Sequence, residues 1–298
     1  MAGPSNQVFI PAGFQELFTF WNHFPGAVIC AGGAGIIRGQ GRHIPILPKY
    51  IISLDRIDDL NRIRRTERYL EIGAMVKLNQ IINLGKIVPE ALMRCLDNIA
   101  GPQIRSQISI GGNLCSSSIR LDIHAPMVAL DAQYELRTAQ STRWIAASRF
   151  SPPRGPIALA PQELLTRIRV PLEPWNFCKY KKFHGAGSNE PDGAVVFIIR
   201  NEKNILTEIR TVYSGQIILR EKSGENKLAG RRLPLEARDA AAFVESWRNL
   251  LSNQEAVSDA KAPPEDGGTQ APGSSSPPGL KNAQILNFIE TAIMEISD

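Results

Sequence analysis

The sequence predicts an α+β fold with more than one domain, on three observations. The chain has 298 residues, 43% of them hydrophobic and 21% charged, which is typical of a globular protein with two or three domains. Amphipathic helical segments and short β-patterned runs are mixed along the chain. Two glycine-rich segments, residues 31–35 and 109–113, each directly follow a short apolar run. We call them the first and the second glycine segment.

Residues 1–55 form the first predicted block. An amphipathic helix is expected over residues 15–24, followed by a strand over 27–30 that leads into the first glycine segment. Further strand-like pieces lie near 44–47 and 50–54. This block is predicted to be an N-terminal lobe.

Residues 56–173 form the second block, which carries the second glycine segment. Its predicted elements are a strand at 69–72, helices near 78–84 and 89–98, an apolar segment at 125–130, and strands at 133–137 and 164–170. Pro171, Pro174 and Trp175 then interrupt the pattern and indicate a domain junction.

Residues 174–298 form the third block. It opens with residues 179–183, and two β-patterned runs follow at 194–200 and 205–219, the second split near Ser214 and Gly215. Helices are predicted near 235–251 and 280–296. Residues 253–280 are rich in Pro, Gly, Ser and acidic residues, so this stretch is expected to be a flexible surface insert against which the last helix docks back.

The glycine segments suggest how the chain binds a ligand. Glycine lets a ligand approach the peptide N–H groups closely, and such amides suit phosphate oxygens. Two such segments favour one long ligand, such as a dinucleotide, held at two points. The first segment is neither a P-loop, because it lacks a Gly-Lys-Ser/Thr ending, nor a Rossmann loop, because Gly39, Gly41, Pro45 and Pro48 follow and exclude a helix interior. We expect it to continue into extended chain.

Charge and membrane signals exclude several classes of function. The net charge is +5 and the isoelectric point about 9.1. Four arginines, at 62, 64, 65 and 68, surround Glu67; a solvated loop is favoured there over a surface for nucleic acid or an acidic partner. The sequence shows neither a signal peptide nor 18 consecutive apolar residues, so no membrane association is expected.

The cysteines and histidines do not predict a metal or catalytic centre. Cys30, Cys95, Cys115 and Cys178 are far apart and match no zinc or iron–sulfur spacing, which favours reduced thiols in a cytoplasmic protein. Cys30 and Cys115 flank the glycine segments, where buried packing roles are favoured over ligand contact. His124 is expected to be a structural histidine, and no catalytic residue is proposed.

Residues 98–132 carry a more specific pattern. The second glycine segment reads Ser-Ile-Gly-Gly-Asn, an aspartate follows nine residues after Asn113 at Asp122, and then come Pro126 and the run Ala-Leu-Asp-Ala at 129–132. This pattern resembles that of the FAD-binding medium subunit of the molybdenum hydroxylases, the xanthine dehydrogenase and carbon monoxide dehydrogenase group, in a divergent form. The resemblance implies a two-lobed FAD-binding fold of the FAD-linked oxidase (PCMH) type, with a smaller C-terminal α+β domain.

The resemblance also implies which residues bind FAD. The first segment and its flanks would hold the pyrophosphate, the second would bind phosphates and ribityl chain, and Asp122 would accept hydrogen bonds from ribose hydroxyls. Ile99 and Ala100 would pack near the adenine, Leu165 would contact the flavin ring, and Lys181, with Lys182 as a rival, would lie near the isoalloxazine. The loop residues are Ile29, Cys30, Ala31, Gly32, Gly33, Ala34, Gly35 and Ile36, then Ser109, Gly111, Gly112, Asn113 and the flanking Cys115.

The function implied by this resemblance is electron transfer within an assembly. FAD would relay electrons from 2Fe-2S centres of a partner subunit to NAD⁺ or another acceptor. A further, molybdopterin-containing subunit would belong to the same assembly. Two alternatives stay open: a stand-alone FAD-dependent oxidoreductase, and a non-catalytic scaffold subunit with weakened FAD binding. The scaffold is suggested by Ala34 and Gly35, which stand where the family usually has Thr and Asp.

Overall fold

The computed structural model describes residues 6–35, 46–116, 123–184, 191–259 and 278–297. The chain divides into two compact units, Met1–Glu173 and Pro174–Asp298. Each unit is described by itself below. The predicted boundary between two lobes near residue 55 lies inside the first unit and stays a prediction.

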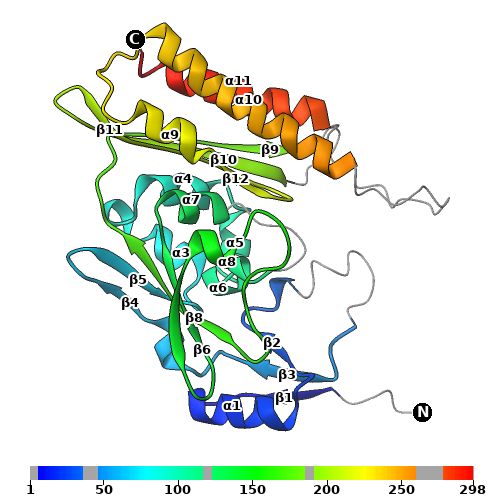
Figure 1. Ribbon diagram of the computed structural model, residues 1–298. Coiled ribbons are helices and arrows are strands. Elements are labelled where there is room, and N and C mark those ends of the chain that lie inside the picture. Colours follow the sequence, from blue (N-terminus) through cyan, green and yellow to red (C-terminus); the bar gives the residue numbers. More distant parts are fainter. Residues whose placement is uncertain (1–5, 36–45, 117–122, 185–190, 260–277, 298) are drawn as a thin grey trace. The chain divides into compact units, whose positions relative to one another are not determined.

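A small parallel sheet opens the first unit. Its strands are β1 (Gln7–Phe9), β3 (Tyr50–Ser53) and β2 (Val28–Cys30), with β3 in the centre. Helix α1 (Phe14–His23) packs on this sheet through an aromatic cluster, in which Phe9 stacks on Phe20 and on Phe24 (Figure 1). The predicted helix and both strands are therefore present, whereas β1 was not predicted. Ile46 and Leu47 belong to no strand, contrary to the expected piece at 44–47, whose first two residues lie outside the described part.

A larger antiparallel sheet follows in the same unit. Its order is β4–β5–β8–β6–β7, and its bounds are Ile63–Arg65, Tyr69–Gly73, Leu164–Pro171, Gln133–Arg137 and Thr142–Ala146. Apolar residues alternate with polar ones on β6 and β8, so one face is buried and the other carries charged side chains. The arginine cluster was expected in a loop, but two of its members lie on the edge strand β4, which pairs with β5. Its arginines are solvent-exposed, as expected.

Short helices complete the first unit. They are η1 (Asp58–Asn61), α3 (Leu78–Ile82), η2 (Gly85–Ile87), α4 (Glu90–Asp97), α5 (Pro102–Arg105), α6 (Ile110–Leu114), α7 (His124–Ala129) and α8 (Ala147–Phe150). The predicted helices at 78–84 and 89–98 correspond to α3 and α4. The apolar segment at 125–130 is the fully buried helix α7.

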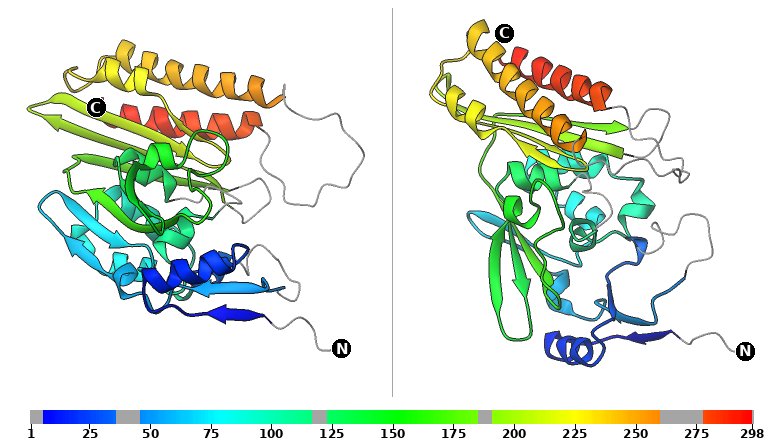
Figure 2. Two further views of the ribbon diagram at one scale, coloured as in Figure 1. Left: turned by 60° about the horizontal axis from the view of Figure 1, so that its bottom comes forward. Right: turned by 45° about the vertical axis from the view of Figure 1, so that its right-hand side comes forward.

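The second unit is an antiparallel sheet covered on one face by helices. The sheet order is β12–β11–β10–β9, with bounds Ile218–Arg220, Ile205–Ser214, Pro191–Glu202 and Phe177–His184. Helices α9 (Lys222–Leu228), α10 (Ala237–Asp259) and α11 (Pro278–Met294) lie on the same face in all views (Figures 1 and 2). The core between them contains Phe197, Phe243, Trp247 and Ile289. The predicted split of the second β run falls between β11 and β12, as expected.

Helices extend into the predicted flexible insert from both sides. Helix α10 continues to Asp259, and α11 begins at Pro278, so both ends of the 253–280 stretch are helical. Residues 254–257 read Gln-Glu-Ala-Val, and the first three of them favour a helix. Residues 260–277 lie outside the described residues.

Candidate functional site

The second glycine segment is the first turn of a helix rather than the end of a strand. Ser109 caps α6, and its hydroxyl oxygen accepts a hydrogen bond from the Gly112 N–H at 3.1 Å. The expected strand-then-turn context is therefore wrong at this position. A serine placed three residues before a glycine amide satisfies a helix terminus, and that local hydrogen bond prevails over the short apolar run.

Close backbone packing holds the second glycine segment in place. The N–H of Gly111 donates to the Ala74 carbonyl at 2.8 Å, and the N–H of Ile110 donates to Val76 at 3.0 Å. A Cβ on Gly111 would lie 2.7 Å from both the Cβ and the carbonyl oxygen of Ala74. Only glycine fits there, because no flexible side chain can move out of the way.

The first glycine segment follows β2, as predicted, but it does not continue as extended chain. Ala34 and Gly35 already have helical conformation. Gly33 has φ = 72°, a value in the left-handed region that favours glycine. The amides of Ala31 and Gly32 have no assigned acceptor among the described residues. These donors are available to an external acceptor, and the predicted contact with a ligand stays a prediction.

The two glycine segments meet in the folded protein. A Cβ on Gly112 would touch the Cβ of Ala31 at 3.6 Å, and a Cβ on Gly32 would collide with the carbonyl oxygen of Gln107 at 2.2 Å. Segments more than 70 residues apart in the sequence thus pack backbone against backbone. This juxtaposition is what the hypothesis of one ligand held at two points requires.

A buried polar atom lies in the second segment. Asn113 is 4% exposed, and its side-chain oxygen has no hydrogen-bond partner among the described residues. Leaving such an acceptor unpaired costs about 1–3 kcal/mol. A ligand hydroxyl would supply the missing donor, so the observation fits a bound sugar or polyol chain.

Two residues at this junction were missed by the sequence reasoning. Lys77 precedes α3, forms an isolated bridge with Ser109, and donates from Nζ to the Gln107 carbonyl at 3.2 Å. Its Nζ would be 3.3 Å from a Cβ on Gly32. Nothing local in the sequence signals these contacts, because Lys77 and Gln107 are 30 residues apart.

The cysteines at the site are thiols without a nucleophilic role. All four cysteines are thiols outside any disulfide. Burial raises the pKa of the Cys115 thiol to about 12, and burial together with Asp55 raises the pKa of Cys30, partly offset by the Gly33 amide and by Lys77. Both thiols stay protonated at neutral pH. Each is partly buried, and the packing role favoured for both stays a prediction.

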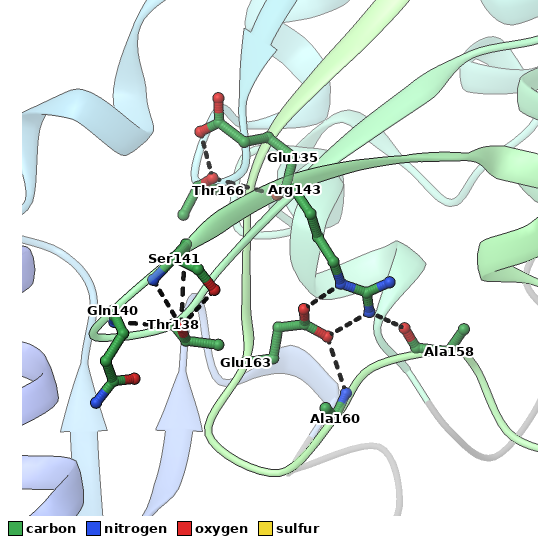
Figure 3. Close-up of polar contacts among 9 residues, drawn as sticks. All are labelled: Glu135, Thr138, Gln140, Ser141, Arg143, Ala158, Ala160, Glu163 and Thr166. Carbon is green, nitrogen blue, oxygen red and sulfur yellow. Dashed lines mark hydrogen bonds and ion pairs between the residues drawn. The ribbon is translucent and has the colours of Figure 1, made fainter.

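An ion pair fixes the segment that leads to Leu165. The Arg143 guanidinium donates two hydrogen bonds of 2.6 and 2.8 Å to the Glu163 carboxylate, which also accepts a hydrogen bond from the Ala160 N–H at 3.0 Å (Figure 3). Hydrogen bonding to Arg143 lowers the pKa of Glu163. Leu165 follows two residues later and is 2% exposed. The loop before β8 therefore has a defined position, and the Leu165 side chain is buried. Its contact with the flavin ring stays a prediction.

The remaining predicted ligand residues are distributed over the chain. Ile99 is buried, whereas the following Ala100 is exposed with φ = 45°, which is unusual for a residue with a side chain. Lys181 is exposed on β9 in the second unit, with Nζ 5.8 Å from the Phe183 ring centroid. Ile36 and Asp122 lie outside the described residues. His124 is buried in α7, and its Nδ1 pairs with the Ser151 hydroxyl at 2.7 Å, which fits a structural role.

The described residues hold neither a metal site nor a helix able to span a membrane. No group of three or more His, Cys, Asp or Glu side chains there could hold a metal ion. No helix in these ranges combines the length and the apolar character needed to cross a membrane.

Comparison with known proteins identifies the family. Residues 4–173 match the family described as the FAD-binding domain in molybdopterin dehydrogenase. The xanthine dehydrogenase FAD-binding subunit of Escherichia coli O157:H7 is 28% identical over 153 residues, 50% of this chain and 52% of that protein. The carbon monoxide dehydrogenase medium chain of Hydrogenophaga pseudoflava is 28% identical over 203 residues, 65% of this chain and 70% of that protein. Rat aldehyde oxidase 1 is 27% identical over 254 residues, 78% of this chain. The match spans only 19% of that oxidase, and about half of the bacterial xanthine dehydrogenase subunit.

Solved structures confirm the predicted fold over the whole chain. A chain of carbon monoxide dehydrogenase from Hydrogenophaga pseudoflava superposes with a TM-score of 0.78 at 20% identity, covering 99% of this chain and 98% of that chain. A chain of quinoline 2-oxidoreductase from Pseudomonas putida 86 gives a TM-score of 0.77 at 17% identity, covering 100% and 98%. These structures confirm the predicted α+β fold of the PCMH type. The family match over residues 4–173 and the FAD-binding relatives confirm the resemblance drawn from residues 98–132 and FAD as the cofactor. The chain belongs to the family of FAD-binding domains of molybdopterin dehydrogenases.

Proposed function

We propose that this chain is the FAD-binding subunit of a multi-subunit molybdenum-containing hydroxylase or dehydrogenase. In this proposal it relays electrons from 2Fe-2S centres of a partner subunit to NAD⁺ or another acceptor. A molybdopterin-containing subunit completes the assembly. The names of relatives, a "medium chain" and an "FAD-binding subunit", support a role as one subunit among several.

One observation carries the proposal: the two glycine segments pack against each other and leave polar groups that have no partner within the described part of the chain. The amides of Ala31 and Gly32 suit the pyrophosphate of FAD, and the buried oxygen of Asn113 suits a ribityl or ribose hydroxyl. The protein groups that bind the cofactor are thus largely backbone. Ala34 and Gly35 lack the Thr and Asp side chains that the family usually has at these positions. The backbone donors of Ala31 and Gly32 do not depend on those side chains.

The chain contributes binding and orientation rather than acid–base chemistry. FAD, when bound, exchanges either one or two electrons, which allows it to connect one-electron and two-electron partners. Asp122, Ile99 and Ala100 are proposed on the adenosine side, and Leu165 and Lys181 on the flavin side. Among the described residues the cysteines form no cluster that could hold a metal, so an iron–sulfur centre is assigned to a partner.

The test is to purify the full-length chain, add FAD, remove unbound cofactor and record the visible spectrum. We expect the absorption bands of a protein-bound oxidised flavin. A chain that retains no flavin would contradict the proposal and favour the scaffold alternative. Co-expression with candidate iron–sulfur and molybdenum subunits then decides the rest: co-purification supports the assembly, and rapid turnover of the isolated flavoprotein with NADH favours the stand-alone oxidoreductase.

A further inference from the structure

Lys77 places a positive charge where the two glycine segments meet. Its Nζ donates to the Gln107 carbonyl at 3.2 Å, and it would contact any Cβ added to Gly32 at 3.3 Å. Its backbone bridges to Ser109, the cap of α6. The side chain is half-buried, so the surrounding protein screens its charge less than bulk water would.

The contacts of Lys77 with the described residues leave its charge uncompensated. An ammonium group has three donors, and within the described ranges this one has a single acceptor, the neutral Gln107 carbonyl. No carboxylate among the described residues forms an ion pair with it. Asp55 lies near enough to raise the pKa of the neighbouring Cys30. It is solvent-exposed, however, and already accepts a hydrogen bond from the Ser53 hydroxyl at 2.9 Å. Lys77 is a half-buried cation with spare donors, and it lies beside amides that have no acceptor among the described residues. Together these groups favour the binding of an anion.

We propose that Lys77 binds the pyrophosphate of the dinucleotide and sets the affinity of this chain for it. The inference rests on the proposed binding of FAD between the glycine segments. Lys77 and the amides of Ala31 and Gly32 form the phosphate end, and the unpaired Asn113 oxygen, an acceptor unsuited to phosphate, forms the hydroxyl end. The two ends differ in charge, and this difference orients the ligand along the junction.

The experiment compares the full-length protein with three variants, Lys77→Met, Lys77→Arg and Lys86→Met. Lys86 is an exposed lysine of η2 in the same unit, so its variant removes the same charge away from the glycine segments. FAD dissociation constants are measured by flavin fluorescence at several salt concentrations, and ADP is titrated separately as a pyrophosphate without flavin. Thermal unfolding without ligand checks that each variant is folded.

We expect Lys77→Met to bind FAD and ADP about tenfold to a hundredfold more weakly, as charge-assisted hydrogen bonds are lost. Its affinity for FAD should also depend less on salt. Lys77→Arg should retain most of the affinity, and Lys86→Met all of it.

Two outcomes would overturn the role of Lys77 and leave FAD binding intact. One is unchanged FAD affinity in Lys77→Met. The other is equal weakening in Lys77→Met and Lys77→Arg with the wild-type salt dependence, which would make the lysine a packing residue. If the unmodified chain binds ADP through Lys77 but not FAD, the proposed function fails and the anion site stands. If it binds neither, both are overturned.

Discussion

The two glycine segments differ in why they contain glycine. In the second segment, Gly111 is buried, and an added Cβ would collide with the Cβ and carbonyl oxygen of Ala74, so close packing requires glycine there. In the first segment, glycine is required at position 32 by a close contact with the other segment and at position 33 by a positive φ. Neither reason applies to Gly35 among the described residues. The second segment is thus part of the architecture, whereas the first is a more exposed element placed against it. Substitutions in the two should therefore affect different properties.

The largest effect is expected for Gly111→Ala. The added methyl group would lie 2.7 Å from backbone and Cβ atoms of Ala74, so the buried chain must shift. Such overpacking costs about 2–3 kcal/mol. Urea unfolding of the ligand-free protein should show this loss in the first unit; a variant of wild-type stability would show that the second segment is not fixed by packing.

Gly32→Ala should mainly weaken ligand binding. Its methyl group would meet the Gln107 carbonyl oxygen at 2.2 Å and separate the two segments. Because Gly32 is exposed, we expect a modest loss of stability but FAD affinity reduced about tenfold to thirtyfold, or about 1.4–2 kcal/mol. A fluorescence titration measures the affinity. Loss of stability as large as that of Gly111→Ala, with unchanged affinity, would remove the distinction between the segments.

Gly33→Ala should have a smaller effect than either. Alanine in the left-handed region costs about 1 kcal/mol, and no described atom obstructs the new methyl group except the Cys30 sulfur at an ordinary 3.9 Å. The matched variant Gly33→Asn should be milder, because asparagine tolerates this conformation better. Equal thermal shifts for the two variants would argue against a conformational cause.

Gly35→Ala is expected to have the smallest effect. Gly35 has helical conformation, and no described atom lies within 4 Å of an added Cβ. Replacing a helical glycine by alanine stabilises by up to about 1 kcal/mol. Thermal unfolding should show an unchanged or slightly higher midpoint, with FAD affinity within twofold of the wild type; a large loss of affinity would mean that this position, too, contacts the ligand.

Strongly patterned elements of the fold were predictable from sequence, and elements that depend on tertiary contacts were not. Strand β6 matches its prediction at both ends, because residues 133–137 alternate cleanly between the two faces of the sheet. Helix α9 was missed, since its sequence Lys-Ser-Gly-Glu-Asn-Lys-Leu has no apolar periodicity. It forms because Glu225 is buried against Arg220 and the Thr211 N–H, at 2.8 Å from each.

The candidate site likewise contains residues that were predictable from sequence and residues that were not. The glycine segments and Asn113 could be located from the sequence because their pattern is local. The helical form of residues 110–114 depends on the hydroxyl of Ser109, which was read as a phosphate contact and not as a cap. Lys77 and Gln107 belong to the site only because they contact each other across 30 residues of sequence, and no single stretch of sequence reveals that contact.

The meeting of the two glycine segments has a thermodynamic consequence. A ligand that spans them binds only the folded first unit, since the unfolded chain keeps the segments apart. Mass action then makes the stability of this unit depend on the supply of FAD, by about 2.7 kcal/mol when free FAD is a hundred times its dissociation constant. A cell short of flavin would hold this chain in a less stable, more readily degraded form, so cofactor supply would set how much of the protein persists.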